Sequence, residues 1–369
     1  MAARRIKLIV NDFHLGKGAL LKDGTVNILE DFRYGAKFAE YLSHYSTGEY
    51  ADCEVELIIN GDFLNLLQID YLGIHSYLVT ERMVTHAVRA IIAGHADVFD
   101  ALQKFAAVPN HSIAYIIGNH DIGLLFDDPR RVMRETIGRN LRFYDTYYEF
   151  DNVRVEHGHM YEAINATDPQ RFILRDPDYP EPVLNLPWAS LFVAMFLPKI
   201  KKERPFVDKV KPFTGYLRWA VMHDTLFAFR TGFFIAFSFL RMFSLARKHP
   251  LLDFRLSFAR MKGTTIYPSF VKEARKILRT NPHLNAIIFG HTHVMRYRQW
   301  GGGKEYLNTG TWNEVTSLDI ADFGLQTVLT YGYIELPPPG SGQRARIRLK
   351  EWKGQWRPEV ETSIMPVGK

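Results

Sequence analysis

Residues 113–121 read Ile-Ala-Tyr-Ile-Ile-Gly-Asn-His-Asp, an apolar run that ends in an amide, an imidazole and a carboxylate. The apolar part, residues 113–117, is long enough for a β-strand and too short for a helix. In α/β proteins, ligands bind beyond the carboxyl ends of the strands, where such polar side chains would lie. This stretch therefore predicts an α/β fold with a functional site at one edge of its sheet.

The same pattern occurs four more times along the chain. Apolar runs at 5–10, 55–60, 152–156 and 285–289 lead into Asp12-Phe13-His14, Gly61-Asp62, His157-Gly158-His159 and Gly290-His291-Thr292-His293. Between some of these runs, apolar residues recur at steps of three and four, which predicts helices over about 80–107 and around 34–42. Strands that alternate with helices indicate buried sheets covered by helices.

The side chains at the five strand ends are of the types that bind metals. Carboxylates combined with imidazoles suit Mn²⁺, Fe, Zn²⁺ or Co²⁺ better than Ca²⁺ or Mg²⁺. We expect two divalent ions, with Mn²⁺ as the leading candidate and Fe, Zn²⁺ and Co²⁺ as alternatives. Two such ions about 3.5–4 Å apart can activate a water and hold phosphate oxygens, so the set predicts hydrolysis of a phosphate ester.

In this order, the motifs Asp-x-His, Gly-Asp, Gly-Asn-His-Asp, His-Gly-x and Gly-His-Thr-His resemble those of the calcineurin-like metallophosphoesterase superfamily. The likeness covers the motif strands of about 1–160 and 284–335, and it includes Tyr306-Leu-Asn-Thr-Gly-Thr-Trp312. It implies an α/β (α+β) fold in which two packed mixed sheets, flanked by helices, form a four-layer sandwich.

The resemblance also implies a role for each motif residue. One metal would be held by Asp12, His14 and His293, the other by Asn119, His157 and His291, with Asp62 bridging both. His120 would contact the phosphate or protonate the leaving oxygen, and Asp121 would orient His120. Two further candidates for substrate contacts are His159, where the superfamily often has an acidic residue, and Asn65, four residues after Gly61.

The regular alternation stops at about residue 165. We expect residues 1–164 and 281–336 to form one catalytic domain, interrupted by an inserted, mostly helical lid at 165–280. A Pro-Pro-Pro-Gly-Ser-Gly linker at 337–342 opens the last segment, 337–369. There, basic residues alternate with small or apolar ones from Arg344 to Lys350, which predicts an exposed C-terminal strand or tail with one basic face.

The lid region is basic and aromatic. Residues 183–263 hold 14 Lys/Arg against 4 Asp/Glu, a local charge of +10 within a net +6, and 16 of the chain's 50 aromatic residues. Its apolar stretches, around 188–197 and 226–245, are too short or too interrupted by charge for a membrane span, which needs roughly 20 apolar residues. Such a segment suits the interface of an anionic membrane. Ordinary packed helices of a cap are the alternative.

Two basic residues of this segment, Arg230 and Arg241, are candidates for substrate contacts. Nucleic acid is not expected as a partner, because Phe, Leu and Met without interleaved polar residues fit a groove or a single strand poorly. The sequence does not fix the oligomeric state.

A metallophosphoesterase with such a lid resembles the UDP-2,3-diacylglucosamine hydrolases of lipid A synthesis, although many of those have arginine and aspartate where His120 and His159 stand. The resemblance implies cleavage of a pyrophosphate in an acylated substrate, with release of UMP and an acylated sugar 1-phosphate. The alternatives are a soluble phosphatase or nucleotide phosphodiesterase, and a non-catalytic scaffold that docks on membranes. Because there is one cysteine and no signal-peptide core at the N-terminus, we expect a cytoplasmic protein peripheral to the inner membrane.

Overall fold

The computed structural model describes residues 3–21, 23–175, 177, 179–205, 207–211, 213–248, 269–317, 324–355 and 360–361. Its larger sheet has seven strands in the order β17-β16-β15-β1-β2-β3-β4. β1 to β4 run parallel, and β15, β16 and β17 continue the sheet antiparallel. The strands are β1 (Arg5–Val10), β2 (Glu54–Asn60), β3 (His111–Ile116), β4 (Leu141–Tyr144), β15 (Thr330–Leu336), β16 (Arg346–Glu351) and β17 (Val360–Glu361).

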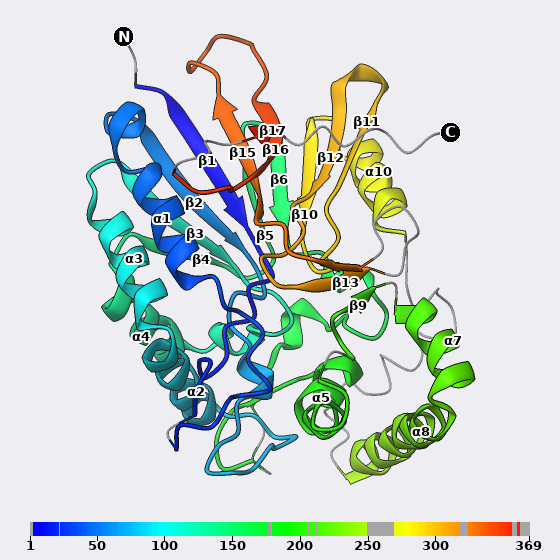
Figure 1. Ribbon diagram of the computed structural model, residues 1–369. Helices are drawn as coiled ribbons and strands as arrows, with labels where there is room; N and C mark the ends of the chain where they lie inside the picture. The colour runs from blue at the N-terminus through cyan, green and yellow to red at the C-terminus, as the bar shows by residue number, and fades with distance from the viewer. Residues whose placement is uncertain are drawn as a thin grey trace.

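Four helices cover the outer face of this sheet (Figure 1). They are α1 (Gly35–His44), α2 (Glu81–Gly94), α3 (Ala96–Ala107) and α4 (Asp127–Ile137). β1 shows how the sheet is buried on both faces: Leu8 packs in the core under the helices, whereas Ile9 faces the second sheet. Burial on both faces explains why the strands read as continuous apolar runs.

The second sheet has five strands in the order β11-β12-β10-β6-β5. β10 is parallel to both β6 and β12, and the outer strands β5 and β11 are antiparallel to their neighbours. The strands are β5 (Tyr147–Phe150), β6 (Val153–Glu156), β10 (Ala286–Phe289), β11 (Arg296–Trp300) and β12 (Lys304–Asn308), and α10 (Phe270–Thr280) covers the outer face.

An apolar core fills the space between the two sheets. It joins Ile9, Ile58 and Ile116 of the first sheet to Val155 and Ile288 of the second. Helices, sheet, sheet and helix thus form four layers (Figure 1), which confirms the fold class predicted from the sequence.

The five strands predicted before the motifs are confirmed as β1, β2, β3, β6 and β10, and the helix around 34–42 is α1. The single helix predicted over 80–107 is wrong, because α2 and α3 are separate helices. They part at His95, which has φ −133° and whose Nε2 lies 3.1 Å from Oε2 of the buried Glu30. The apolar period runs through both helices, so it gives no sign of this break.

The basic strand predicted near the C-terminus exists as β16, but it is exposed only in part, at Arg346. It lies between β15 and β17, and its residues Leu349 and Lys350 are buried. Lys350 places its ammonium over the ring of Tyr333, so this basic residue packs on the sheet, whereas Arg344 and Arg346 are exposed.

Residues 165–280, predicted as a mostly helical lid, form a set of helices and short strands. These are β7 (Ile173–Leu174), β8 (Val183–Leu184), α5 (Trp188–Met195), α6 (Leu197–Lys201), β9 (Val210–Lys211), α7 (Phe213–His223) and α8 (Thr225–Lys248), besides α10. β9 pairs with β13 (Val315–Ser317), which in turn pairs with β14 (Gly324–Gln326). The boundaries of the predicted domains stay a prediction, and residues 249–268 lie outside the described residues.

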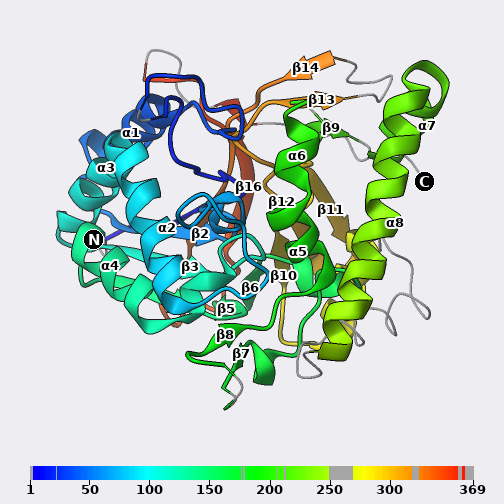
Figure 2. The ribbon, with the colours of Figure 1, turned by 90° about the horizontal axis from the view of Figure 1, so that it is seen from below.

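Figure 2 shows α8 at the outer edge of the molecule, beyond α5 and α6. α5 packs into the core under the first sheet through Leu191 and Ala194, whereas α8 contributes Phe227 to a small separate core. Among the described helices, none combines the length and the apolar character needed to cross a bilayer.

Candidate metal centre

The predicted ligands follow the strands in a strained backbone conformation. Five of them, Asp12, His14, Asp62, His291 and His293, have positive φ angles between 50° and 69°. Residues other than glycine rarely adopt such angles, and they gather at functional sites where the surrounding structure enforces them. Backbone hydrogen bonds enforce them here, since the amides of Asp12 and His14 donate to the carbonyls of Gly61 and Asp62 at 3.1 and 2.9 Å.

Asp12, His14 and His293 form one compact group. Nε2 of His14 lies 3.0 Å from Nε2 of His293, and Oδ1 of Asp12 lies 3.8 and 3.6 Å from these two atoms. Ligands that each lie about 2.1 Å from a common ion are about 3 to 3.4 Å apart, so the spacing of His14 and His293 suits a bound ion and the two spacings to Asp12 are a few tenths of an ångström wider. The structure thus brings together the residues expected at the first metal.

Asp62, His157 and His291 form a second compact group. Oδ2 of Asp62 lies 3.1 Å from Nε2 of His157 and 3.9 Å from Nε2 of His14, so Asp62 lies between the two groups as a bridging ligand would. Nδ1 of His157 lies 2.9 Å from the carbonyl of Asn60. That bond places the proton on Nδ1 and turns the lone pair of Nε2 toward the centre.

Two buried oxygen atoms at the centre lack a partner among the described residues. They are Oδ1 of Asp12 and Oδ1 of Asn119, the latter from the residue expected to complete the second metal site. Buried polar atoms normally form hydrogen bonds. Unpartnered oxygens that lie with imidazole nitrogens fit divalent cations.

Glycine is required at two positions beside Asp62. A Cβ on Gly61, which has φ 78°, would lie 2.5 Å from the ring of His157. A Cβ on Gly118 would meet the carboxylate and the amide of Asp62. The Gly-Asp and Gly-Asn motifs therefore allow the ligands to approach one another across the strand ends.

The electrostatics of the centre also favour a cation. Burial raises the pKa of Asp12 to about 6, and burial together with the nearby His120 lowers the pKa of His14 to about 3. Against the effect of burial, the carboxylate of Asp62 raises the pKa of His157 to about 10. Without a metal ion, a protonated His157 would balance the charge of Asp62, a role that a bound cation would take over.

His120 forms a third compact group with His14 and Asp62, and Asn65 holds it in place. Nδ1 of His120 lies 2.9 Å from Oδ1 of the buried Asn65, and the ring of His120 is 4.5 Å from that of His14. The orienting role expected of Asp121 stays a prediction; its carboxylate accepts hydrogen bonds from Tyr115 Oη and from the amides of Phe63 and Gly118. These bonds hold Asp121 in the loop, and Asn65 is the residue whose side chain contacts His120 Nδ1.

The other candidate substrate contacts lie in two places. His159 is buried at the centre, with its ring 5.4 Å from that of His157. Arg230 and Arg241 lie on α8, where Arg230 forms an ion pair with Glu203. Their contact with a substrate stays a prediction.

The structure adds two residues that no motif indicated. Lys211 on β9 acts electrostatically on Asp12, Glu162 and His293, and its burial lowers its pKa. Glu162 lies 2.9 Å from His291. Lys211 reaches the centre because β9 pairs with β13, a contact between segments more than 100 residues apart that no local pattern signals.

No protein-family model matches the sequence, and no curated protein matches it. Among solved structures, a dimetal phosphatase from Danio rerio is 10% identical with a TM-score of 0.36, covering 95% of each chain. Vacuolar Protein Sorting 29 from Cryptosporidium parvum is 11% identical with a TM-score of 0.33, covering 98% of this chain and 100% of that chain.

A protein described as a predicted phosphoesterase from Streptococcus pneumoniae is 9% identical with a TM-score of 0.29, covering 98% of this chain and 100% of that chain. At such scores, none of these likenesses supports a conclusion about this chain. Its chemistry follows from the geometry of its own centre.

Proposed function

We propose that this chain is a dinuclear-metal hydrolase that cleaves a phosphodiester or pyrophosphate bond, in a lipid-linked substrate such as UDP-2,3-diacylglucosamine. The observation that carries the proposal is the pair of compact ligand groups, one of which contains Asp62 while its carboxylate also lies 3.9 Å from His14 of the other. Two divalent ions held there would acidify a water and offset the charge of the phosphate.

The side chains around the ligands supply the remaining chemistry. With Nδ1 of His120 bonded to Asn65, Nε2 is the nitrogen left for the substrate. Burial lowers the pKa of His120, so the ring is neutral until a phosphate adds negative charge beside it. Protonated in that way, Nε2 would donate to the phosphate or to the leaving oxygen.

Lys211 is suited to bind a phosphate oxygen. Among the described residues it forms no ion pair within 4 Å, unlike Lys201 and Lys209 of the same segment, which both pair with Asp31. A partly buried ammonium beside the centre, with nearby carboxylates but no ion pair within 4 Å among the described residues, offers a charge-assisted bond to an anionic substrate.

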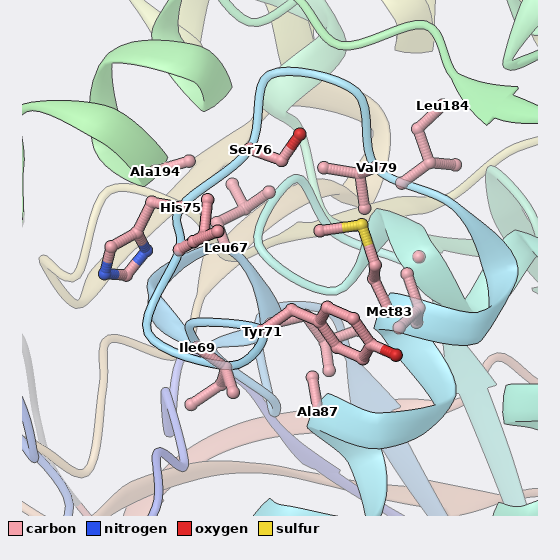
Figure 3. Close-up of a pocket in the computed structure, with 14 residues that line it drawn as sticks. Leu67, Ile69, Tyr71, His75, Ser76, Val79, Met83, Ala87, Leu184 and Ala194 are labelled. Carbon is pink, nitrogen blue, oxygen red and sulfur yellow. The ribbon is translucent and has the colours of Figure 1, made fainter.

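An apolar pocket next to the centre supports the lipid-linked substrate. It begins at Leu66, which follows Asn65, and Gly123, two residues after Asp121, also lines it. Figure 3 shows Leu67, Val79 and Met83 around this space, and Leu184 and Ala194 bring the lid to its rim. Such a lining offers few polar groups to a sugar or a base, but the cavity holds only about 30 Å³, so it would have to widen to admit an acyl chain.

The outer face of α8 supports a contact with a membrane surface. Its outer stripe consists of Leu226, Phe229, Phe233, Phe237 and Leu240, whose side chains are 44 to 80% exposed. These residues recur at three- and four-residue steps, so they lie on one side of the helix. Arg230 and Arg241 flank the stripe, which matches an apolar face that enters the interface of an anionic bilayer.

The proposed hydrolysis predicts the effect of His120→Ala. We expect kcat to fall about 10²- to 10⁴-fold, the usual contribution of a positioned acid or base, with little change in thermal stability. Initial rates under Mn²⁺ would be measured on UDP-diacylglucosamine, a cyclic nucleotide, a phosphopeptide and an aryl phosphate.

His283→Ala is the matched control for His120→Ala, because His283 is largely exposed. Near-normal turnover by His120→Ala would contradict the proposed role. Turnover of the water-soluble esters that exceeds that of the lipid substrate would favour the phosphatase or nucleotide phosphodiesterase, and absence of turnover on all four would favour the non-catalytic scaffold.

Lys211→Met should lower kcat/KM on the preferred substrate about 10- to 100-fold, since a hydrogen bond to a charged group contributes about 1.5–3 kcal/mol. The loss should fall mainly on KM. Lys202→Met removes an exposed lysine of the same segment and should leave both constants unchanged. Equal kinetics of the two variants would exclude Lys211 as a phosphate contact.

Replacement of Phe229 and Phe233 by serine should weaken binding to vesicles that contain anionic lipid by at least about tenfold, because each buried Phe contributes about 1.5–3 kcal/mol. Sedimentation with vesicles measures the effect. The control replaces Leu20 and Val26, which are both 61% exposed outside the lid, by serine. If wild-type protein does not bind such vesicles, the membrane contact is refuted while the hydrolytic proposal stands.

A further inference from the structure

The carboxylate of Glu162 contacts one of the proposed metal ligands from behind. Its Oε2 lies 2.9 Å from Nε2 of His291 and accepts a hydrogen bond of 2.6 Å from Nδ2 of Asn165. Both Glu162 and Asn165 are buried, so water does not compete for these bonds. The contact is thus a fixed part of the centre.

The backbone holds Glu162 in this position. A 3₁₀ turn, His159–Tyr161, follows Gly158, and the amide of Glu162 donates to the carbonyl of His159 at 3.1 Å. The carbonyl of Glu162 in turn accepts from the amides of Asn165 and Ala166 at 3.0 and 2.9 Å. His157 and Glu162 therefore leave β6 as one rigid unit, the first a ligand and the second the partner of another ligand.

The contact determines which nitrogen of His291 is free. A carboxylate beside Nε2 draws the proton onto that atom and leaves the lone pair on Nδ1. The amide of His291 donates to Oδ2 of Asp12 at 2.8 Å, which fixes the other side of the residue. Glu162 belongs to none of the three sets of His and Asp donors that converge among the described residues, so its place is behind the ligand and not on the ion; the sets are Asp12-His14-His293, Asp62-His157-His291 and His14-Asp62-His120.

We infer that Glu162 is a positioning residue that fixes His291 for one of the two metal ions, the one shared with His157 and Asn119. The inference rests on the metal centre of the proposed function. Histidine ligands whose second nitrogen has lost its partner typically bind metal 10- to 100-fold more weakly. Loss of Glu162 should accordingly weaken the binding of one ion. The affinity for the other ion, held by Asp12, His14 and His293, should stay almost unchanged.

The test is the affinity of the full chain for Mn²⁺ and Zn²⁺, measured by titration against a competing chelator. In Glu162→Ala we expect one of two binding steps to weaken about 10- to 100-fold, and Glu162→Asp or Glu162→Gln to recover part of it. Glu149→Ala is the matched control, because Glu149 faces the exposed His283 at 3.7 Å and should change neither step.

A second readout concerns the ring of His291 itself. Nitrogen NMR of the metal-free protein should find the ring proton of His291 on Nε2 in the wild type. In Glu162→Ala, the proton should exchange between Nδ1 and Nε2. Unchanged affinity for both ions in Glu162→Ala would overturn the inference. If that variant does not fold, Glu162→Gln, which keeps the volume of the side chain, decides the matter by the same titration.

The inference and the proposed function can fail separately. Wild-type protein that binds two ions but hydrolyses none of the substrates would refute the function and leave the role of Glu162 intact. Wild-type activity together with unaltered metal binding in both Glu162→Ala and Glu162→Gln would refute the role of Glu162 alone.

Discussion

Two carboxylates and four imidazoles share one small volume at the edge where the two sheets meet, and this crowding is the constraint on which the rest depends. The donor atoms of Asp12, His14 and His293, and those of Asp62, His157 and His291, lie within 4.8 Å of one another in each group. So many lone pairs, buried away from water, need positive charge among them. In the metal-free protein, protons supply part of this positive charge. Bound divalent cations would supply more of it.

The layered fold is what makes the crowding possible. Parallel pairing of β1, β2 and β3 carries Asp12, Asp62 and Asn119 to one edge, and parallel pairing of β6 and β10 carries His157 and His291 to the matching edge of the second sheet. Bonds between the sheets hold the two edges in register. One runs from Nδ2 of Asn60 to the carbonyl of Glu156 at 3.1 Å.

A feature could be predicted from the sequence when the residues that form it lie near one another in the chain. Strand runs and the residues directly after them are local, so the motif strands and the ligands Asp12 and Asp62 are apparent in the sequence. The break at His95, the approach of Lys211 and the contact of Glu162 with His291 depend on partners distant in the chain. The apolar period of α8 likewise predicts a helix, but not that its Phe229 side faces outward.

The count of bound metal tests the account most directly. Protein purified without chelator would be analysed for Mn, Fe, Zn and Co by mass spectrometry, beside an Asp62→Ala variant. The account predicts close to two ions per wild-type chain and a clear loss in the variant, because Asp62 belongs to one group and its carboxylate lies 3.9 Å from His14 of the other. Fewer than one ion per wild-type chain, after incubation with Mn²⁺ as well, would contradict it.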